Sequence, residues 1–158
     1  MAGKLEGELK KRDGFATPQQ SVVVGLLRTN DQFQYRFARL FREHRLTQPQ
    51  YNVLRILRGE GAPLPCLEVA DRLIAMVPAI TGLVDKLEAR GLVTRVRSES
   101  DRRVWLIDLT DAGRELLAQL DRPVLDLHAR LCRALTDDEC RQLAGLLEKA
   151  REGVADLP

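Results

Sequence analysis

Residues 64–113 constrain the fold of this chain more than any other segment. Two short runs with apolar residues at helical spacing follow each other closely, and the second ends at Gly91. Two strand-like runs come next, at 92–97 and 104–109, and the second is rich in β-branched and aromatic residues. The polar residues 98–103 join them. The segment therefore predicts the order helix, turn, helix, strand, basic loop, strand.

The bounds of the helix pair follow from residues that favour the start or the end of a helix. The first helix is predicted at about 66–73 and the second at about 77–90, with a turn at 74–76 between them. Pro78 suits the first turn of the second helix, and Gly91 suits the position just past its end. Its inward stripe has spacing 0, 3, 4 and 7: Ile80, Leu83, Val84 and Leu87. This is the layout of a winged helix, mainly α with a small β-hairpin wing.

The rest of the chain predicts helices on both sides of the winged domain. Residues 1–17 are predicted to be a flexible polar arm, and 18–45 a long helix. The winged domain takes 46–110, and 111–158 hold two further helices, the last with an inward stripe of three leucines, Leu143, Leu146 and Leu147. These outer helices carry more leucine than a small winged domain needs. We therefore expect their apolar faces to pack together, within one chain or across a two-fold axis.

Threonines mark the starts of three helices. Thr47 with Gln50 and Thr136 with Glu139 each match the capping box, in which two side chains satisfy two free backbone N–H groups. Thr110 precedes an acidic residue and matches a simple N-cap. Helices are therefore expected to begin directly after each of these threonines.

Composition excludes several classes of protein. No apolar run approaches the ~20 residues that span a bilayer, and the charged N-terminus lacks the apolar core of a secretory signal. We therefore expect a cytoplasmic protein with no membrane partner. Aromatic residues are only 4% of the chain, which disfavours base-stacking platforms for single-stranded nucleic acid. A net charge of +2 is weak evidence for nucleic-acid binding by itself.

The distribution of arginine along the chain is more informative than its total. Arg95 and Arg97 lie on the strand that leads into the loop, and Arg102 and Arg103 lie at its tip. Arginine inserted into a narrow minor groove reads DNA shape. Asp101 would weaken phosphate binding unless it pairs with an arginine and fixes its direction. The alternative is a solvated hairpin whose charges only protect an edge strand; after a helix–turn–helix, DNA contact is favoured.

The second helix of the pair offers small residues to DNA. Thr81 can hydrogen-bond a base, and Ala79 can touch a thymine methyl. Gly82 costs a helix about 1 kcal/mol relative to alanine, which suggests a close approach by DNA or by a neighbouring element. Lys86 is placed to neutralise a phosphate. Because no arginine or glutamine lies in the first two turns, we expect the wing arginines and Lys86 to supply most of the affinity.

The chain resembles the MarR family of winged-helix regulators. The resemblance rests on LTQPQYNVLRIL, LEVADRL, ITGLVDKLEARGLVTR, the DRR at 101–103 and LTDAG at 109–113. It implies an obligate homodimer that binds double-stranded DNA at a pseudo-palindromic operator and usually represses a neighbouring gene. It also implies a small aromatic or phenolic ligand, bound between the dimer region and the winged domain.

The resemblance assigns roles to positions of this chain. It makes Asp101 and Arg103 the wing pair, with Arg102 or Arg103 at the minor groove. The reader positions are four: Pro78, Ala79, Thr81 and Gly82. The chain departs from the family where a serine cap and a polar residue are common, because Met76 and Val77 stand there. It also has Gly82 where a basic residue often follows the threonine, so its reading face is unusually bare.

Two further sets of residues are candidates for regulation. Aromatic side chains at Phe33, Phe37, Phe41 and Tyr51 are candidates for a ligand pocket or, alternatively, for the core. Cys132 and Cys140 are either buried structural thiols or redox sensors, because each adjoins an arginine that favours the thiolate.

Catalysis and metal binding are not expected. The two histidines lie far apart in the sequence, no cysteine pair has metal-ligand spacing, and no motif for a nucleophile, a phosphate loop or paired carboxylates stands out. The sequence therefore predicts a protein that is not an enzyme and needs no cofactor or metal.

The sequence predicts a homodimeric transcription regulator, a repressor released by a small-molecule ligand. The alternative hypothesis is a ligand or redox sensor that has lost much of its DNA reading and acts through a protein partner.

Overall fold

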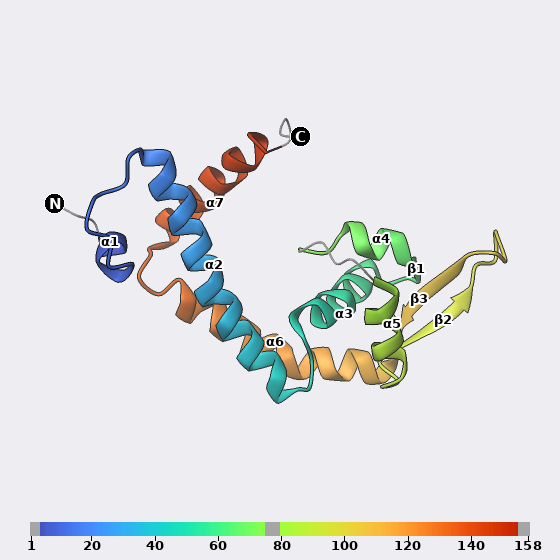
Figure 1. Cartoon of the computed structure of the whole chain (residues 1–158). Helices are drawn as coiled ribbons and strands as arrows, with labels where there is room; N and C mark the ends of the chain where they lie inside the picture. Colours follow the sequence, from blue (N-terminus) through green and yellow to red (C-terminus); the bar gives the residue numbers. More distant parts are fainter. Residues whose placement is uncertain (1–3, 75–79, 155–158) are drawn as a thin grey trace.

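The computed structural model describes residues 4–74 and 80–154. The fold is mainly helical with one small antiparallel sheet, as the sequence predicts. Its helices are α1 Lys4–Glu8, α2 Pro18–Glu43, α3 Gln48–Glu60, α4 Cys66–Asp71, α5 Ile80–Glu88, α6 Asp111–Leu131 and α7 Asp137–Glu152. The strands are β1 Leu64–Pro65, β2 Val93–Arg97 and β3 Trp105–Leu109. Figure 1 shows the winged domain at one end and α1, α7 and the start of α2 at the other.

The predicted helix starts are confirmed by their cap hydrogen bonds. Thr47 and Gln50 form a full capping box at α3, and Thr136 and Glu139 form another at α7. The Thr110 hydroxyl accepts the backbone N–H of Gly113 at 3.1 Å, at the start of α6. Each cap satisfies N–H groups that the first turn of a helix leaves free, so local chemistry alone places these boundaries.

The sheet of the winged domain has three strands in the order β1–β3–β2. The hairpin of β2 and β3 matches the predicted wing. Strand β1 is not among the elements that the sequence predicts. Its residue Leu64 is buried and lies opposite Ile107 of β3. The third strand therefore exists because β3 offers a free edge and because Leu64 completes the core.

The Thr110–Gly113 motif joins the wing to α6. The Thr110 hydroxyl donates to the carbonyl of Gly91 at 2.7 Å, and its N–H donates to the carbonyl of Leu92 at 3.3 Å. A Cβ at Gly113 would lie 2.3 Å from the Leu92 carbonyl oxygen, so only glycine fits. The motif thus locks the end of the second helix of the pair onto the start of α6.

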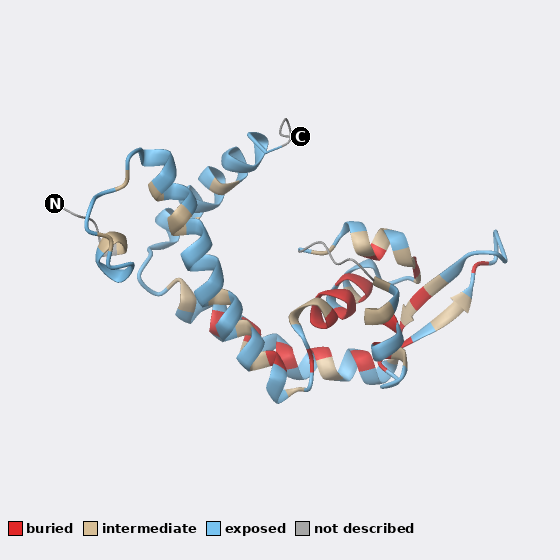
Figure 2. Ribbon diagram, viewed as in Figure 1, coloured by how far each residue is buried: buried red, intermediate tan, exposed pale blue. Residues whose placement is uncertain are grey.

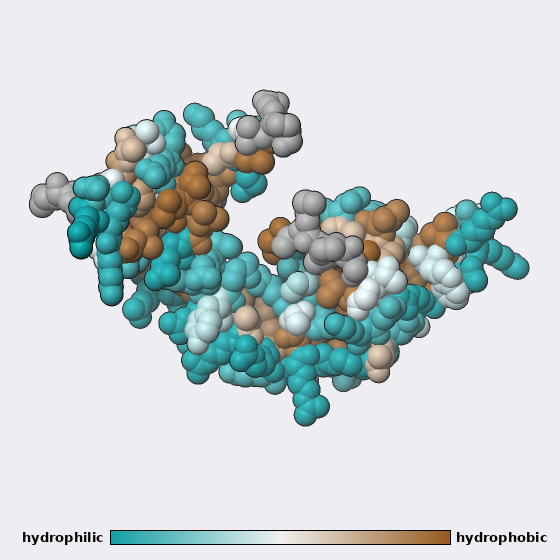
Figure 3. Space-filling view, in the orientation of Figure 1, coloured by the Kyte–Doolittle hydropathy of each residue, from teal (hydrophilic) through white to brown (hydrophobic). Residues whose placement is uncertain are grey.

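The buried residues gather in the winged domain and along α6, as Figure 2 shows. The outer helices differ. No residue of α7 is buried, so the inward stripe predicted for Leu143, Leu146 and Leu147 does not pack into a core of the same chain. Of the two packings expected for the outer helices, the one across a two-fold axis stays a prediction. The first half of α2 also exposes apolar side chains, and Figure 3 shows them as a continuous apolar surface at that end of the molecule.

Helix α1 lies in the segment for which the sequence predicts a flexible arm. The Leu5 side chain packs against α2 at Gly25, 3.7 Å from the place a Cβ would take there. Among the described residues, no helix combines the length and the apolar character that crossing a bilayer requires.

Candidate DNA-binding interface

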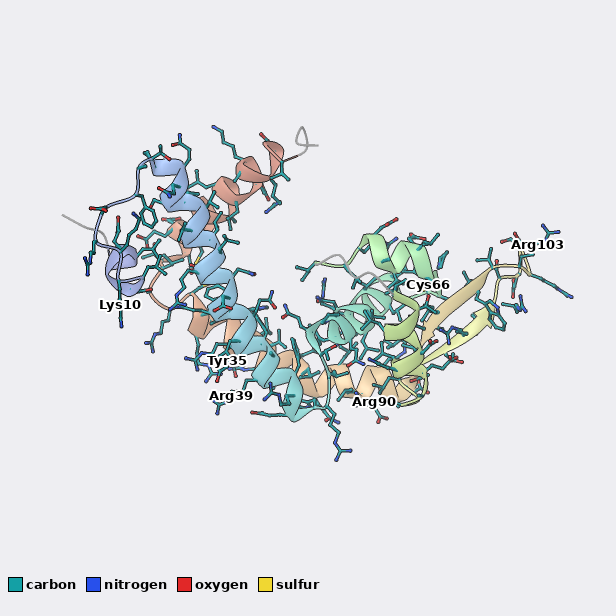
Figure 4. The ribbon with its side chains drawn as sticks, viewed as in Figure 1. Lys10, Tyr35, Arg39, Cys66, Arg90 and Arg103 are labelled. Carbon is teal, nitrogen blue, oxygen red and sulfur yellow. The ribbon has the colours of Figure 1, made fainter. Side chains whose placement is uncertain are left out.

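The wing projects from the far end of the winged domain. Its strands pair in register, so that Arg97 faces Trp105 across the hairpin. Two backbone hydrogen bonds close the tip: Ser98 donates to Val104 at 3.0 Å, and Val104 donates to Asp101 at 2.9 Å. Arg103 lies at the extreme end of the molecule in Figure 4. The wing therefore presents its tip residues well away from the core.

Arg102 and Arg103 are the exposed cations of the wing tip. Within the described residues, neither guanidinium forms an ion pair or a side-chain hydrogen bond. Both side chains are thus available to a negatively charged partner.

Asp101 acts on the backbone of the tip and not on an arginine side chain. Its carboxylate accepts the backbone N–H of Arg103 at 2.9 Å. The backbone N–H of Asp101 in turn donates to the buried Ser98 hydroxyl at 3.4 Å. Of the two alternatives that the sequence leaves for Asp101, a pair with an arginine side chain is not found among the described residues. Asp101 fixes the turn that carries Arg103. An aspartate side chain that accepts the backbone N–H two residues further along the chain forms a local turn.

Arg97 belongs to the framework of the wing. Its guanidinium lies over the Trp105 ring, 3.9 Å from the ring centre, and donates to the carbonyl oxygen of Arg102. A guanidinium over an aromatic face is attracted by the negative potential of that face. Arg97 is thus engaged on both sides and differs from the two arginines at the tip.

Arg95 ties the wing to α5. Its guanidinium forms ion pairs with Asp85 and Glu88, and its backbone N–H also donates to Glu88 at 3.2 Å. The side chain is only 26% exposed. The hydrogen bond that the Arg95 guanidinium donates to Asp85 is the main cause that raises the pKa of Arg95. Arg95 therefore links β2 to α5, and its expected contact with DNA stays a prediction.

The alternation of side chains along β2 is the sequence signal that could have set Arg95 and Arg97 apart from the two arginines at the tip. Arg95 and Arg97 share a strand face with the buried Val93, since side chains two residues apart point the same way. The acids Asp85 and Glu88 lie three residues apart on α5 and therefore share one helix face. Sequence reasoning grouped the four arginines by proximity and missed this division.

The second helix of the pair is described from Ile80 onwards, so Pro78 and Ala79 lie outside the described residues. Thr81 and Lys86 are exposed. No described atom lies within 4 Å of the place a Cβ would take at Gly82. The sequence suggests two reasons for this glycine, a close approach by DNA or by a neighbouring element. No neighbouring element among the described residues comes close to it.

Arg90 was missed as an anchoring residue. It donates to the carbonyl of Arg45 at 2.6 Å and to that of His44 at 3.3 Å. These carbonyls lie just past the end of α2 and lack helical partners. Arg90 thereby fixes the end of α5 to the α2–α3 junction, a long-range contact that no local pattern indicates.

The predicted aromatic pocket is mostly filled by its own side chains. Phe41 stacks on Tyr51 with ring centres 4.4 Å apart, and Phe37 stacks on Phe41 at 6.0 Å. Burial raises the pKa of the Tyr51 hydroxyl. Only Phe33 of the four borders an open groove, of about 970 Å³, between α2 and the end of α6. Four arginines also line this groove: Arg36, Arg39, Arg130 and Arg133.

The two cysteines lie on either side of the α6–α7 turn. Cys132 caps the end of α6, and Cys140 lies in the first turns of α7. Desolvation raises the pKa of Cys140, and the Cys132 thiol and nearby acids add to the effect. Arg141 instead pairs with Asp138 at 2.6 Å. The expected lowering of the thiol pKa by arginine is therefore wrong for Cys140, which favours the unreactive thiol.

Comparison with known proteins gives three informative similarities and one family match. Residues 46–105 match the model of the MarR family. The chain is 27% identical over 129 residues to the homoprotocatechuate degradative operon repressor of Escherichia coli, covering 82% of this chain and 86% of the relative. A MarR transcription factor from Planctomyces limnophilus is 39% identical, with a TM-score of 0.66 and coverage of 85% of this chain and 98% of that one. A cysteine-to-serine mutant of E. coli MarR in complex with operator DNA is 25% identical, with a TM-score of 0.73 and coverage of 99% and 100%.

Proposed function

Because the chain belongs to the MarR family of transcription regulators, we propose that it is a homodimeric repressor that binds a pseudo-palindromic operator and is released by a small ligand. The observation that carries the proposal is the pair Arg102 and Arg103, exposed and free of ion pairs with described residues at the end of a braced wing. The operator complex of the E. coli relative supports DNA as the partner.

In this proposal the wing and α5 contact different parts of the DNA. Arg102 and Arg103 enter a minor groove, where narrow width strengthens the attraction for arginine. Lys86 neutralises a phosphate, and Thr81 touches a base edge beside the open position at Gly82. Pro78 and Ala79 keep the reader roles that the family resemblance gives them. Arg95 and Arg97 hold these groups in place.

The dimer part of the proposal rests on apolar side chains exposed at one end of the molecule, on the first half of α2 and on α7. On α2 they are Val22, Val23, Leu26 and Leu27, and on α7 they are Leu143 and Leu146. An apolar patch of this kind on a single chain marks an interaction surface. A two-fold axis through this end would set the two wings and reading helices on one face of DNA, one helical turn or about 34 Å apart.

The ligand part of the proposal moves from the aromatic cluster to the groove between α2 and α6. Phe41 and Tyr51 are packed against each other and leave no room between them. The groove is lined by apolar side chains and by Arg36, Arg39, Arg130 and Arg133, together with two acids, Asp31 and Glu43. Because guanidinium groups bind carboxylates in a bidentate manner, we expect an aromatic compound that carries an acid group.

The alternative function is a sensor that acts through a protein partner. The bare reading face of α5, with Thr81 and Gly82 in place of long polar side chains, favours it. It differs from the repressor in one respect that can be measured, which is whether the protein selects a DNA sequence.

Selection from a pool of random duplexes tests the proposal directly. The full-length protein should enrich a two-fold symmetric sequence, and footprinting on that duplex should protect two half-sites about one helical turn apart. A thermal-shift screen with benzoate and hydroxybenzoates then tests the groove, with Arg39→Ala as the variant and Arg122→Ala as its surface control. A pool that stays random after repeated rounds would favour the partner-binding sensor.

A further inference from the structure

We infer that Trp105 is a positioning residue for operator binding, because its ring holds Arg97 and Arg97 in turn holds the backbone of the wing tip. The inference rests on the proposed function and goes beyond it, since it assigns operator affinity to a side chain outside the predicted DNA contacts. Trp105 is the only tryptophan of the chain.

The first step is the stack across the hairpin. Trp105 begins β3 and lies opposite Arg97, which ends β2. The guanidinium lies over the indole at 3.9 Å from its centre, and Trp105 remains 46% exposed. A large apolar side chain so exposed adds little to the core. The stack gives its ring a partner and gives Arg97 a fixed direction.

The second step leads from Arg97 to the tip. Its guanidinium donates to the carbonyl oxygen of Arg102, the residue directly before Arg103. The other side of the tip is held by Asp101, which accepts the backbone N–H of Arg103. The peptide unit between Arg102 and Arg103 is therefore gripped at its carbonyl and at its N–H.

The third step connects this grip to affinity. A six-residue polar tip without such contacts would sample many conformations, and binding would have to restrict them. A tip that is already ordered presents both arginines to DNA at a smaller entropic cost. Removal of the indole face releases Arg97, and through Arg97 it releases the Arg102 carbonyl.

The experiment uses the full-length protein and a labelled duplex taken from the random-pool selection. Dissociation constants come from fluorescence anisotropy at one salt concentration. We expect Trp105→Leu and Arg97→Gln each to weaken binding about fivefold to tenfold. Trp105→Phe keeps an aromatic face and should stay within about twofold of wild type. Val104→Ala, an exposed neighbour outside the stack, serves as the matched control and should leave affinity unchanged.

The double variant separates positioning from direct contact. If Trp105 acts through Arg97, the Trp105→Leu/Arg97→Gln protein should bind no more weakly than either single variant, since coupled residues are not additive. Additive losses would mean that the indole contacts DNA itself and would overturn the inference. So would wild-type affinity of Trp105→Leu.

Intrinsic fluorescence checks the stack without DNA. Because the indole emission comes from Trp105 alone, Arg97→Gln should change this emission spectrum in the free protein, whereas Arg103→Ala should not. Circular dichroism melts of every variant show whether the fold is kept. If the wild-type protein selects no duplex at all, the proposed function fails. If it selects one and Trp105→Leu binds it normally, only this inference fails.

Discussion

The winged domain buries most of its leucines, whereas the outer helices α2 and α7 expose most of theirs. In the winged domain, Leu54 and Leu87 are fully buried against the sheet and α6. In the outer helices, Leu27 and Leu146 are each 65% exposed. Figure 2 makes the contrast visible: the buried residues gather in the winged domain and along α6, and none lies in α7. The winged domain therefore completes its core within one chain, while the outer helices leave apolar side chains exposed.

Core truncation in the winged domain should have the largest effect. Leu54→Ala leaves a cavity among side chains that cannot collapse fully and should lower the free energy of unfolding by about 2–5 kcal/mol. Leu67→Ala removes the same atoms from a side chain that is 77% exposed and should change it by less than about 0.5 kcal/mol. Urea denaturation followed by circular dichroism measures both. Equal losses would show that the winged domain has no closed core.

A charge in the exposed apolar face of α7 should break the dimer. Leu146→Glu would place a carboxylate in an apolar interface and should weaken dimerisation at least a hundredfold, about 2.7 kcal/mol. Light scattering coupled to size-exclusion chromatography measures the mass. Leu67→Glu adds the same charge to an exposed position of the winged domain and should leave the mass unchanged. A monomeric wild type, or a dimeric Leu146→Glu protein, would contradict the role given to this face.

The wing tip should account for the next largest effect. The double variant Arg102→Ala/Arg103→Ala removes both tip cations and should weaken binding to the selected duplex at least tenfold, or about 1.4 kcal/mol. Its thermal unfolding should match wild type, because neither guanidinium is paired within the described residues. Arg122→Ala on α6 removes an arginine that is 84% exposed and far from the wing, and it is the control. Unchanged affinity in the double variant would remove the wing from the interface.

Lys86 should contribute through charge alone. Lys86→Ala should weaken binding to selected and unselected duplexes by a similar factor. The slope of log affinity against log salt should fall by about 1. The measurement is a series of anisotropy titrations at several salt concentrations. A loss confined to the selected duplex would instead give Lys86 a role in base recognition.

Prediction from sequence succeeded where short-range chemistry decides the structure. Thr47, Thr110 and Thr136 cap their helices because each hydroxyl needs only an N–H three residues on. Gly91 has a φ of 68°, which a helix stop of this kind requires and which glycine adopts freely. The fold class follows from the order of such signals.

Prediction failed where distant segments decide the role of a side chain. Leu64 forms a strand only because β3 lies beside it, and Arg90 donates to carbonyls that are 45 and 46 residues away in the sequence. Arg95 and Arg97 differ from Arg102 and Arg103 because one strand face points at α5 and at Trp105. Local composition shows four arginines, and only the packing shows that Arg95 and Arg97 have partners within the chain while Arg102 and Arg103 are exposed at the tip.

The smallest expected effect concerns the N-terminal cap of α7, a helix that has no buried residue to stabilise it within the chain. A helix without buried residues depends on its own caps, and Glu139 supplies one of them. The backbone N–H of Thr136 donates to its carboxylate at 2.8 Å and, with the Thr136 hydroxyl, lowers the pKa of Glu139. Because the folded pKa is lowered, this contribution is complete above the ordinary glutamate pKa and is lost as the pH falls through the lowered value.

The measurement is a carbon-detected NMR titration of the Glu139 carboxyl in the folded protein. Its midpoint should lie below that of a free glutamate, and Thr136→Ala should move it upward by removing the hydroxyl donor. In the wild type, the amides of α7 should lose protection from hydrogen exchange as the pH falls. This loss should disappear in Glu139→Gln and remain in Glu148→Gln on the same helix. If α7 keeps its protection in acid in the wild type, a partner chain holds the helix more strongly than its cap does. The outer helices would then depend on burial as the winged domain does.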